Sequence, residues 1–134
     1  MSNKPDAKWP RFEPEVAPYF EAAEQGKLVI KRCLACTKAH FYPRAHCPHC
    51  FSAETEWLPA SGLGVVYSFT VIQRGETPTI VAYVTLAEGP KMLTNIVDCP
   101  PEAVSIGRSV RVGFREQPDG VAVPVFHLAE EAQA

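Results

Sequence analysis

The sequence lacks any apolar run long enough to cross a bilayer, and residues 1–15 are polar and interrupted by prolines. No stretch near the N-terminus fits a secretory signal peptide, so we expect a cytoplasmic protein with no membrane segment. Strong charge of either sign is also missing. A formal net charge of -2 gives no general attraction to nucleic acid or to an anionic membrane.

A convincing catalytic pair is missing as well. Cys99 ends a predicted strand, and no motif pairs it with a histidine base, so we interpret it as a small buried thiol. His127 is interpreted as a packing or surface residue. Carboxylates such as Glu88 and Asp98 lie in predicted turns without a paired arrangement. An independent enzyme is therefore the weakest functional hypothesis.

The chain does contain two close cysteine pairs, Cys33-x-x-Cys36 and Cys47-x-x-Cys50, separated by ten residues. A CxxC turn directs two thiolates at one point, and two such turns complete a tetrahedron around Zn²⁺. Four cysteines close the coordination sphere and leave no position for water or substrate. The pattern therefore predicts a structural zinc site in a rubredoxin-like ribbon.

Other uses of these cysteines stay open. Two disulfides would need an oxidising compartment, which the polar N-terminus does not indicate. An iron centre uses the same four ligands, but its knuckles usually have glycine after the second cysteine, where this chain has Thr37 and Phe51. We therefore prefer zinc. The nearby histidines are interpreted as loop residues rather than ligands: His40, His46 and His49.

A stretch without acidic residues surrounds these pairs, since the chain from Lys27 to Cys50 has five cations and no Asp or Glu. Two interpretations remain open. The cations can neutralise the thiolate-rich site and solvate the ribbon, or they can bind a phosphorylated ligand, for which arginine supplies forked donors and lysine a point charge. The candidate phosphate contacts are Lys27, Lys31, Arg32 and Arg44.

Residues before the ribbon predict one short helix, Pro14 to Gln25, because Pro18 suits a first helical position and Gly26 a stop. So short a helix must dock its apolar face on its own domain or on another protein. That face contains Tyr19, Phe20 and Ala23. The ribbon's extended pieces are predicted at Lys27–Arg32, His40–Pro43 and Glu56–Pro59.

Beyond Ser61 the pattern changes to short strands rich in β-branched and aromatic residues, punctuated by Gly, Pro, Asn and Asp. The strands are predicted at Val65–Ile72, Ile80–Leu86, Met92–Val97, Val110–Phe114 and Val121–His127. Five short strands without a helical period favour an OB-fold, although periodicity alone also allows an SH3-like barrel.

The predicted fold class is therefore mainly β. Its parts are an N-terminal segment with a short helix (1–26), a rubredoxin-like zinc ribbon (27–60), a five-stranded OB-fold barrel (61–128) and a loose tail (129–134). Zinc ribbons and OB-folds both occur in single-stranded nucleic-acid binders, which keeps that function as the alternative. Five cations against six acids between Ser61 and Leu128 argue against it.

The order of motifs carries a family resemblance. It runs through Tyr19-Phe20, Gly26 to Cys33, Tyr42-Pro43-Arg44, Cys47-Pro48-His49-Cys50, Trp57, Ser61-Gly62-x-Gly64, Val66 to Thr70 and Ile106-Gly107. This series resembles the zinc-ribbon and OB-fold proteins called DUF35, which are associated with acyl-CoA metabolism. Tyr42 stands where a second proline is common in that family.

The resemblance implies an accessory role without catalytic residues. Such proteins associate with thiolase-like enzymes, including thiolase-fold aldolases, or with MaoC-like enoyl-CoA hydratases. The ribbon and helix contact the partner, and the protein helps hold the CoA thioester as a shared ligand. A hetero-oligomer with such an enzyme is therefore the expected assembly, and the cations named above are its expected CoA contacts.

Overall fold

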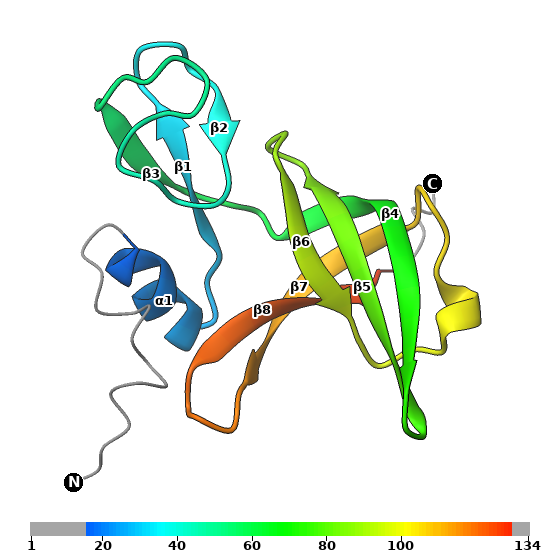
Figure 1. The fold of residues 1–134 in the computed structure, drawn as a ribbon. Coiled ribbons are helices and arrows are strands. Elements are labelled where there is room, and N and C mark those ends of the chain that lie inside the picture. The colour runs from blue at the N-terminus through cyan, green and yellow to red at the C-terminus, as the bar shows by residue number, and fades with distance from the viewer. Residues whose placement is uncertain (1–15, 130–134) are drawn as a thin grey trace, which may run out of the picture. The chain divides into compact units, whose positions relative to one another are not determined.

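The computed structural model describes residues 16–129. Expectations for residues 1–15 and 130–134, including the first residues of the predicted helix and most of the tail, lie outside the described residues. The described elements, in chain order, are α1 (Ala17–Glu24), β1 (Val29–Cys33), β2 (Ala39–His40), β3 (Thr55–Pro59), β4 (Leu63–Arg74), β5 (Thr77–Leu86), β6 (Lys91–Ile96), the 3₁₀ turn η2 (Pro101–Ala103), β7 (Ser109–Glu116) and β8 (Ala122–Leu128) (Figure 1).

These elements form two compact units. The first comprises the described chain up to Ala60 together with Phe114–Pro124, and the second comprises Ser61–Gly113 together with the chain from Val125. None of the helices within residues 16–129 has the length and apolar character needed to span a membrane.

Helix α1 ends as the sequence predicts. The N–H of Lys27 donates to the carbonyl of Ala22, the N–H of Gly26 donates to that of Ala23, and Gly26 takes a φ of +77°. This is the Schellman arrangement, in which a glycine in the left-handed region satisfies the last helical carbonyls. The helix predicted over Pro14–Gln25 begins later than expected within the described residues, because Val16 is its N-cap and Ala17 its first helical residue. Pro18 is thus the second helical residue, not the first.

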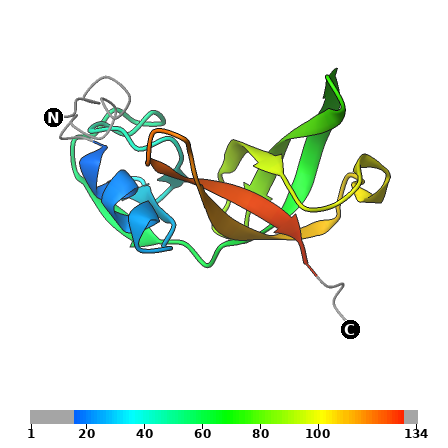
Figure 2. The same ribbon diagram turned by 90° about the horizontal axis from the view of Figure 1, so that it is seen from below.

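The apolar face of α1 docks on its own unit. Tyr19, Phe20 and Ala23 are buried, and both views place α1 beside β1 (Figures 1 and 2). The Tyr19 ring also lies 5.8 Å from the ring of Phe41 and 6.1 Å from that of Tyr42, measured between centroids. Contact with the ribbon therefore supplies the tertiary packing that so short a helix requires.

The ribbon is a three-stranded antiparallel sheet in the order β2-β1-β3. Its central strand buries Ile30 and Cys33 completely. The extended piece predicted over His40–Pro43 is shorter than expected, because strand β2 ends at His40. Beyond it the chain bends at Phe41 and reaches Pro43, which has no N–H to donate to a ladder.

The second unit contributes most of a closed five-stranded barrel in the order β4-β5-β6-β8-β7, with β6 and β8 parallel. The five predicted strands are all present, although β4 is longer than expected. Burial alternates along β5, as a strand with one face on the core requires. The core includes Val66, Val84, Met92, Val110 and Phe126.

Two glycines explain the Ser61-Gly62-x-Gly64 motif. A Cβ at Gly62, whose φ is +85°, would lie 2.5 Å from the Val112 side chain. A Cβ at Gly64 would lie 2.7 Å from the carbonyl oxygen of Thr85 on the neighbouring strand. The motif therefore allows β4 to pack closely against its two partner strands, β5 and β7.

Candidate metal centre

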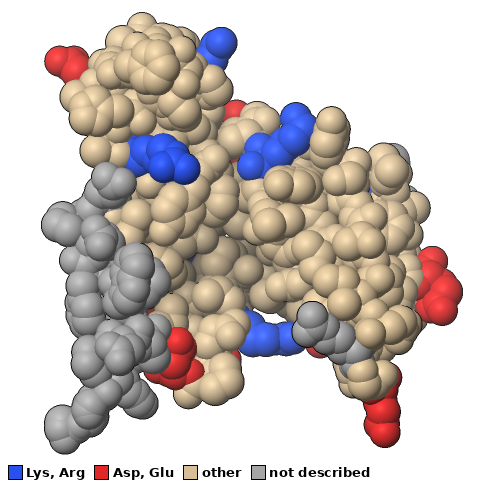
Figure 3. All heavy atoms as spheres, in the orientation of Figure 1, with Lys and Arg blue, Asp and Glu red and all other residues tan. Residues whose placement is uncertain are grey.

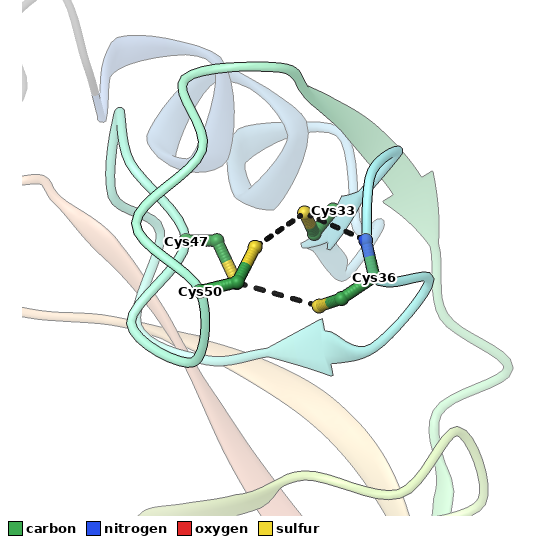
Figure 4. Close-up of side chains that lie close together, drawn as sticks. All are labelled: Cys33, Cys36, Cys47 and Cys50. Atoms are coloured by element: carbon green, nitrogen blue, oxygen red, sulfur yellow. Dashed lines mark hydrogen bonds between the residues drawn. The ribbon is translucent and has the colours of Figure 1, made fainter.

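Two loops of the ribbon bring the four predicted ligands together. Cys33 ends β1 and Cys36 follows in the next turn, whereas Cys47 and Cys50 lie in the long loop before β3 (Figure 4). All four sulfur atoms lie within 4.8 Å of one another. The sequence prediction that these side chains share one site is therefore confirmed.

The spacing fits a tetrahedral metal. The Sγ atoms of Cys33 and Cys50 are 3.6 Å apart, and those of Cys36 and Cys47 are 3.8 Å apart. A Zn–S bond of about 2.3 Å in a tetrahedron sets the sulfur atoms about 3.8 Å apart. A disulfide would need a separation of about 2.05 Å. The cysteines are thus positioned to bind one metal ion, with every ligand position filled by sulfur.

The two cysteine turns share one hydrogen-bond pattern. In the first, the N–H of Thr37 donates to the carbonyl of Cys33 at 2.9 Å; in the second, the N–H of Phe51 donates to the carbonyl of Cys47 at 2.8 Å. Further N–H groups point at sulfur: that of Cys36 donates to Cys33 Sγ at 3.3 Å. An N–H group that donates to sulfur stabilises the thiolate form of that cysteine before a metal binds.

Electrostatics inside the site lower the pKa of the Cys33 and Cys47 thiols. The Ser52 N–H lowers the pKa of Cys50, but the neighbouring Cys33 thiol and desolvation outweigh it and raise that pKa to about 11. Cys33 and Cys47 are fully buried, whereas Cys50 is exposed. The N–H of Cys36 lowers the pKa of the Cys33 thiol to about 7, against the opposing effect of burial. Because metals bind the thiolate form, a lowered pKa prepares this side chain for coordination near neutral pH.

Thr37 and Phe51 occupy equivalent positions in the two turns, each directly after the second cysteine. Both have a φ of +68°, in the left-handed region that favours glycine. The sequence departs from the usual glycine there, but the backbone keeps the conformation that glycine would take. The knuckle geometry is therefore retained at both positions.

The interpretation of all three ribbon histidines as loop residues is wrong for His40. This residue ends strand β2 and is only 3% exposed, and neither ring nitrogen has a hydrogen-bond partner among the described residues. Burial is the main cause that lowers its pKa, and the neighbouring His49 adds to the effect. His46 and His49 are exposed loop residues, as expected.

The four candidate phosphate contacts are not equivalent. Lys27 and Arg44 are exposed. Lys31 is only 8% exposed, and its Nζ donates to Thr55 Oγ1 at 2.9 Å. Arg32 points to the opposite face of β1 and donates through Nε to Glu56 at 2.9 Å. Figure 3 shows Lys and Arg side chains as separate spots, not one continuous patch, on the face drawn.

One polar pair in the barrel was not foreseen from the sequence. His127 Nε2 lies 2.9 Å from Asp98 Oδ2, and both side chains are exposed. They come from the ends of β8 and β6, which meet only in the closed barrel, so no local signal could have found them. Beside them, Cys99 is half-buried, and burial raises the pKa of its thiol.

Two family models match consecutive parts of the chain. Residues 20–56 match the ChsH2 rubredoxin-like zinc ribbon domain, and residues 57–115 match the ChsH2 C-terminal OB-fold domain. The OB-fold is thus the barrel type, and the SH3-like alternative is dropped.

The curated relatives are of two kinds: some are named scaffold proteins, and others are named subunits of a hydratase or a thiolase. A DUF35 domain-containing scaffold protein of Methanothermobacter thermautotrophicus is 37% identical over 70% of this chain and 79% of its own length. A probable enoyl-CoA hydratase alpha subunit of Thermomonospora curvata is 38% identical over 94% of this chain, which spans 42% of that protein. The benzoylsuccinyl-CoA thiolase subunit BbsA of Geobacter metallireducens is 38% identical, covering 63% of this chain and 60% of its own.

Solved structures agree with the fold. A chain of the Ltp2-ChsH2(DUF35) aldolase matches with a TM-score of 0.76 and 38% identity, over 89% of this chain and 98% of that one. A DUF35 protein of Sulfolobus solfataricus matches with a TM-score of 0.68 at 18% identity, covering 91% of this chain and 92% of its own, which shows the shared fold alone.

Proposed function

Because the chain belongs to the DUF35 family of zinc-ribbon and OB-fold scaffold proteins, we propose that it is a non-catalytic accessory subunit of an acyl-CoA enzyme. One observation carries the proposal: this protein resembles one chain of the Ltp2-ChsH2(DUF35) aldolase, with 38% identity and a match that covers 98% of that chain. In such a complex the partner supplies the catalytic residues and this chain completes the assembly.

The partner is a thiolase-like enzyme or a MaoC-like enoyl-CoA hydratase. Relatives named as a thiolase subunit and as a hydratase alpha subunit support these two classes. Both classes act on CoA thioesters, so the shared ligand of the hetero-oligomer is a CoA ester.

The metal is zinc, and its role is structural. Four thiolates at tetrahedral spacing leave no open position for water or substrate, which is the donor set of a closed zinc site. Zinc bound there would fix the two cysteine loops to each other and hold the ribbon in shape for the partner.

Exposed cations of the ribbon help hold the phosphates of CoA. Lys27, Arg32 and Arg44 are exposed to solvent, and the two arginines carry forked donors that suit phosphate. Lys31 would have to give up its bond to Thr55 to take part, so its main contribution is to the ribbon itself.

Co-purification followed by reconstitution tests the proposal. The tagged full chain is captured from its native lysate, the stoichiometric partner is identified by mass spectrometry, and both proteins are then purified separately. We expect CoA-ester turnover by the mixture, less or none by the partner alone, and none by this chain alone. Turnover by this chain alone, or a purified partner whose activity and binding ignore it, would overturn the accessory role.

Single-stranded nucleic-acid binding is the second candidate, favoured by two exposed tyrosines on the barrel. Tyr67 is 55% exposed and Tyr83 is 45% exposed, and the Nζ of Lys91 lies 4.6 Å from the centre of the Tyr67 ring. Bases stack on such rings in OB-folds. Fluorescence anisotropy with a labelled oligonucleotide tests it, and a Kd of about 1 μM at about 0.15 M salt would move this function to first place.

A further inference from the structure

Phe51 combines two unfavourable features. It is 77% exposed, more than any other large hydrophobic residue in the described range. Its φ of +68° lies in the left-handed region, where a side chain with a Cβ is disfavoured and glycine is not. A bulky apolar residue there lowers the stability of the free chain, so a reason for its presence must be sought in a bound state.

The equivalent residue of the other cysteine turn shows what an ordinary solution looks like. Thr37 has the same φ of +68°, and its hydroxyl donates to the carbonyl of Cys36, so its side chain makes a local bond in return. A phenyl ring has no group that could do this. Of the two residues with this φ, Thr37 gains a local hydrogen bond from its side chain and Phe51 does not. The free ribbon therefore gives no reason for the phenyl ring.

The two cysteine turns contain no charged side chain, and the nearest charged residue to Phe51 along the chain is the exposed Glu54. Residues 45–53 and 33–37 contain no Asp, Glu, Lys or Arg. Leu34, in the second of these segments, is 53% exposed. On the face of the ribbon drawn in Figure 3, few Lys, Arg, Asp or Glu side chains are seen. These two segments lack the cations that would bind phosphate or nucleic acid. An exposed aromatic ring among few charges is instead typical of the centre of a protein–protein interface.

We propose that the Phe51 ring is the anchor by which the ribbon docks, inserted into an apolar pocket of the partner enzyme. This inference rests on the proposed function and names the contact that the accessory subunit makes. The partner side must be apolar and uncharged at this point, because a buried charge opposite the ring would be left unpaired.

The structure allows a test in which stability and binding move in opposite directions. Phe51→Gly places the preferred residue at a φ of +68°, so the full-length variant should keep its metal and unfold at the same or a higher temperature. Its Kd for the purified partner from the reconstitution above should rise by about 30-fold or more, as for a truncated aromatic anchor. Phe51→Leu should bind with intermediate affinity.

Two controls match this variant. Thr37→Gly makes the same backbone change in the other turn, and Ile106→Ala removes a side chain that is 70% exposed in the turn before β7. Both should bind the partner within about threefold of the unchanged chain, a difference of under about 0.7 kcal/mol. A loss of affinity in Thr37→Gly equal to that in Phe51→Gly would overturn the anchor, since the effect would belong to the turn backbone.

The outcomes separate the two proposals. If the unchanged chain binds the partner and Phe51→Gly binds equally well, the anchor is wrong and the accessory function stands. If the unchanged chain binds no purified acyl-CoA enzyme, the accessory function fails first. Should Phe51→Gly lose its metal, the same measurement is made on Phe51→Asn, because asparagine tolerates the left-handed region; retained affinity there also overturns the anchor.

Discussion

The ammonium group of Lys31 lies over the indole ring of Trp57, with its Nζ 4.7 Å from the ring centre. The two residues are direct partners across β1 and β3. Arg32, the next residue, is exposed and pairs with Glu56. Successive side chains of a strand point to opposite faces. Lys31 is therefore buried in the ribbon, whereas the adjacent Arg32 faces solvent.

We expect Lys31→Ala to destabilise the metal-loaded protein far more than Arg32→Ala does. Loss of the cation–π contact, the bond to Thr55 and the packed stem of Lys31 should reduce the free energy of unfolding by about 1–3 kcal/mol. An exposed ion pair such as that of Arg32 contributes less than about 1 kcal/mol. Urea unfolding of both variants makes the comparison. Equal losses would mean that the buried lysine is not a structural residue.

Removal of the metal should unfold the ribbon. Cys33→Ser or Cys47→Ser deletes a buried ligand, and structural zinc in zinc-finger peptides contributes about 10–16 kcal/mol to folding. We expect one zinc per chain in the unchanged protein by elemental analysis, and loss of zinc, protease resistance and partner binding in either variant. Cys99→Ser, outside the cluster, is the control and should keep all three. A Cys33→Ser chain that still folds and binds its partner would refute a structural metal.

Local patterns predicted the features that depend on neighbours in sequence. The CxxC turns place Cys33, Cys36, Cys47 and Cys50 correctly because each turn is made by four consecutive residues. Gly26 predicts the end of α1 for the same reason, since the cap bonds involve only the last helical turn. The strand segments of the barrel were equally readable from their β-branched residues.

Other features depend on residues far apart in sequence. Burial of Lys31 is created by Trp57 on another strand, so a count of cations cannot separate it from exposed Arg44. The pair of Asp98 and His127 exists only once the barrel closes. The sequence shows that Phe51 replaces the usual glycine, but it does not show whether the backbone of the turn changes as a result. The hydrogen bonds of the turn impose the left-handed conformation regardless of the side chain.

Arginines on the ribbon should affect CoA binding without affecting the metal. In the reconstituted complex, we expect Arg32→Ala combined with Arg44→Ala to raise the apparent KM for the CoA ester by about tenfold, which equals about 1.4 kcal/mol. Zinc content should not change. Lys38→Ala combined with Arg111→Ala removes the same charge from exposed positions outside the proposed contact and is the matched control. An unchanged KM in the first double variant would remove these arginines from the CoA site.

Alkaline pH should destabilise the packing of α1 through one phenol. Burial, with a contribution from Tyr42, raises the pKa of Tyr19 well above its ordinary value. An unfolded tyrosine ionises near pH 10, so its burial leaves stability unaffected below that pH and reduces it as pH rises further. The loss is about 1.4 kcal/mol per pH unit once the unfolded phenol ionises and the folded one does not.

Tyr19→Phe isolates this contribution, because it keeps the ring against Phe41 and removes the ionising group. We expect the unfolding free energies of the two proteins to run parallel from pH 7 to about 9.5, then to diverge as the unchanged protein loses stability faster. A hydrogen bond lost with the hydroxyl would shift the unfolding free energy of Tyr19→Phe by the same amount at every pH below about 9.5, so it would not change the slopes that are compared. Curves that stayed parallel to about pH 11.5 would mean that Tyr19 ionises as readily folded as unfolded, and so that α1 does not pack on the ribbon in solution.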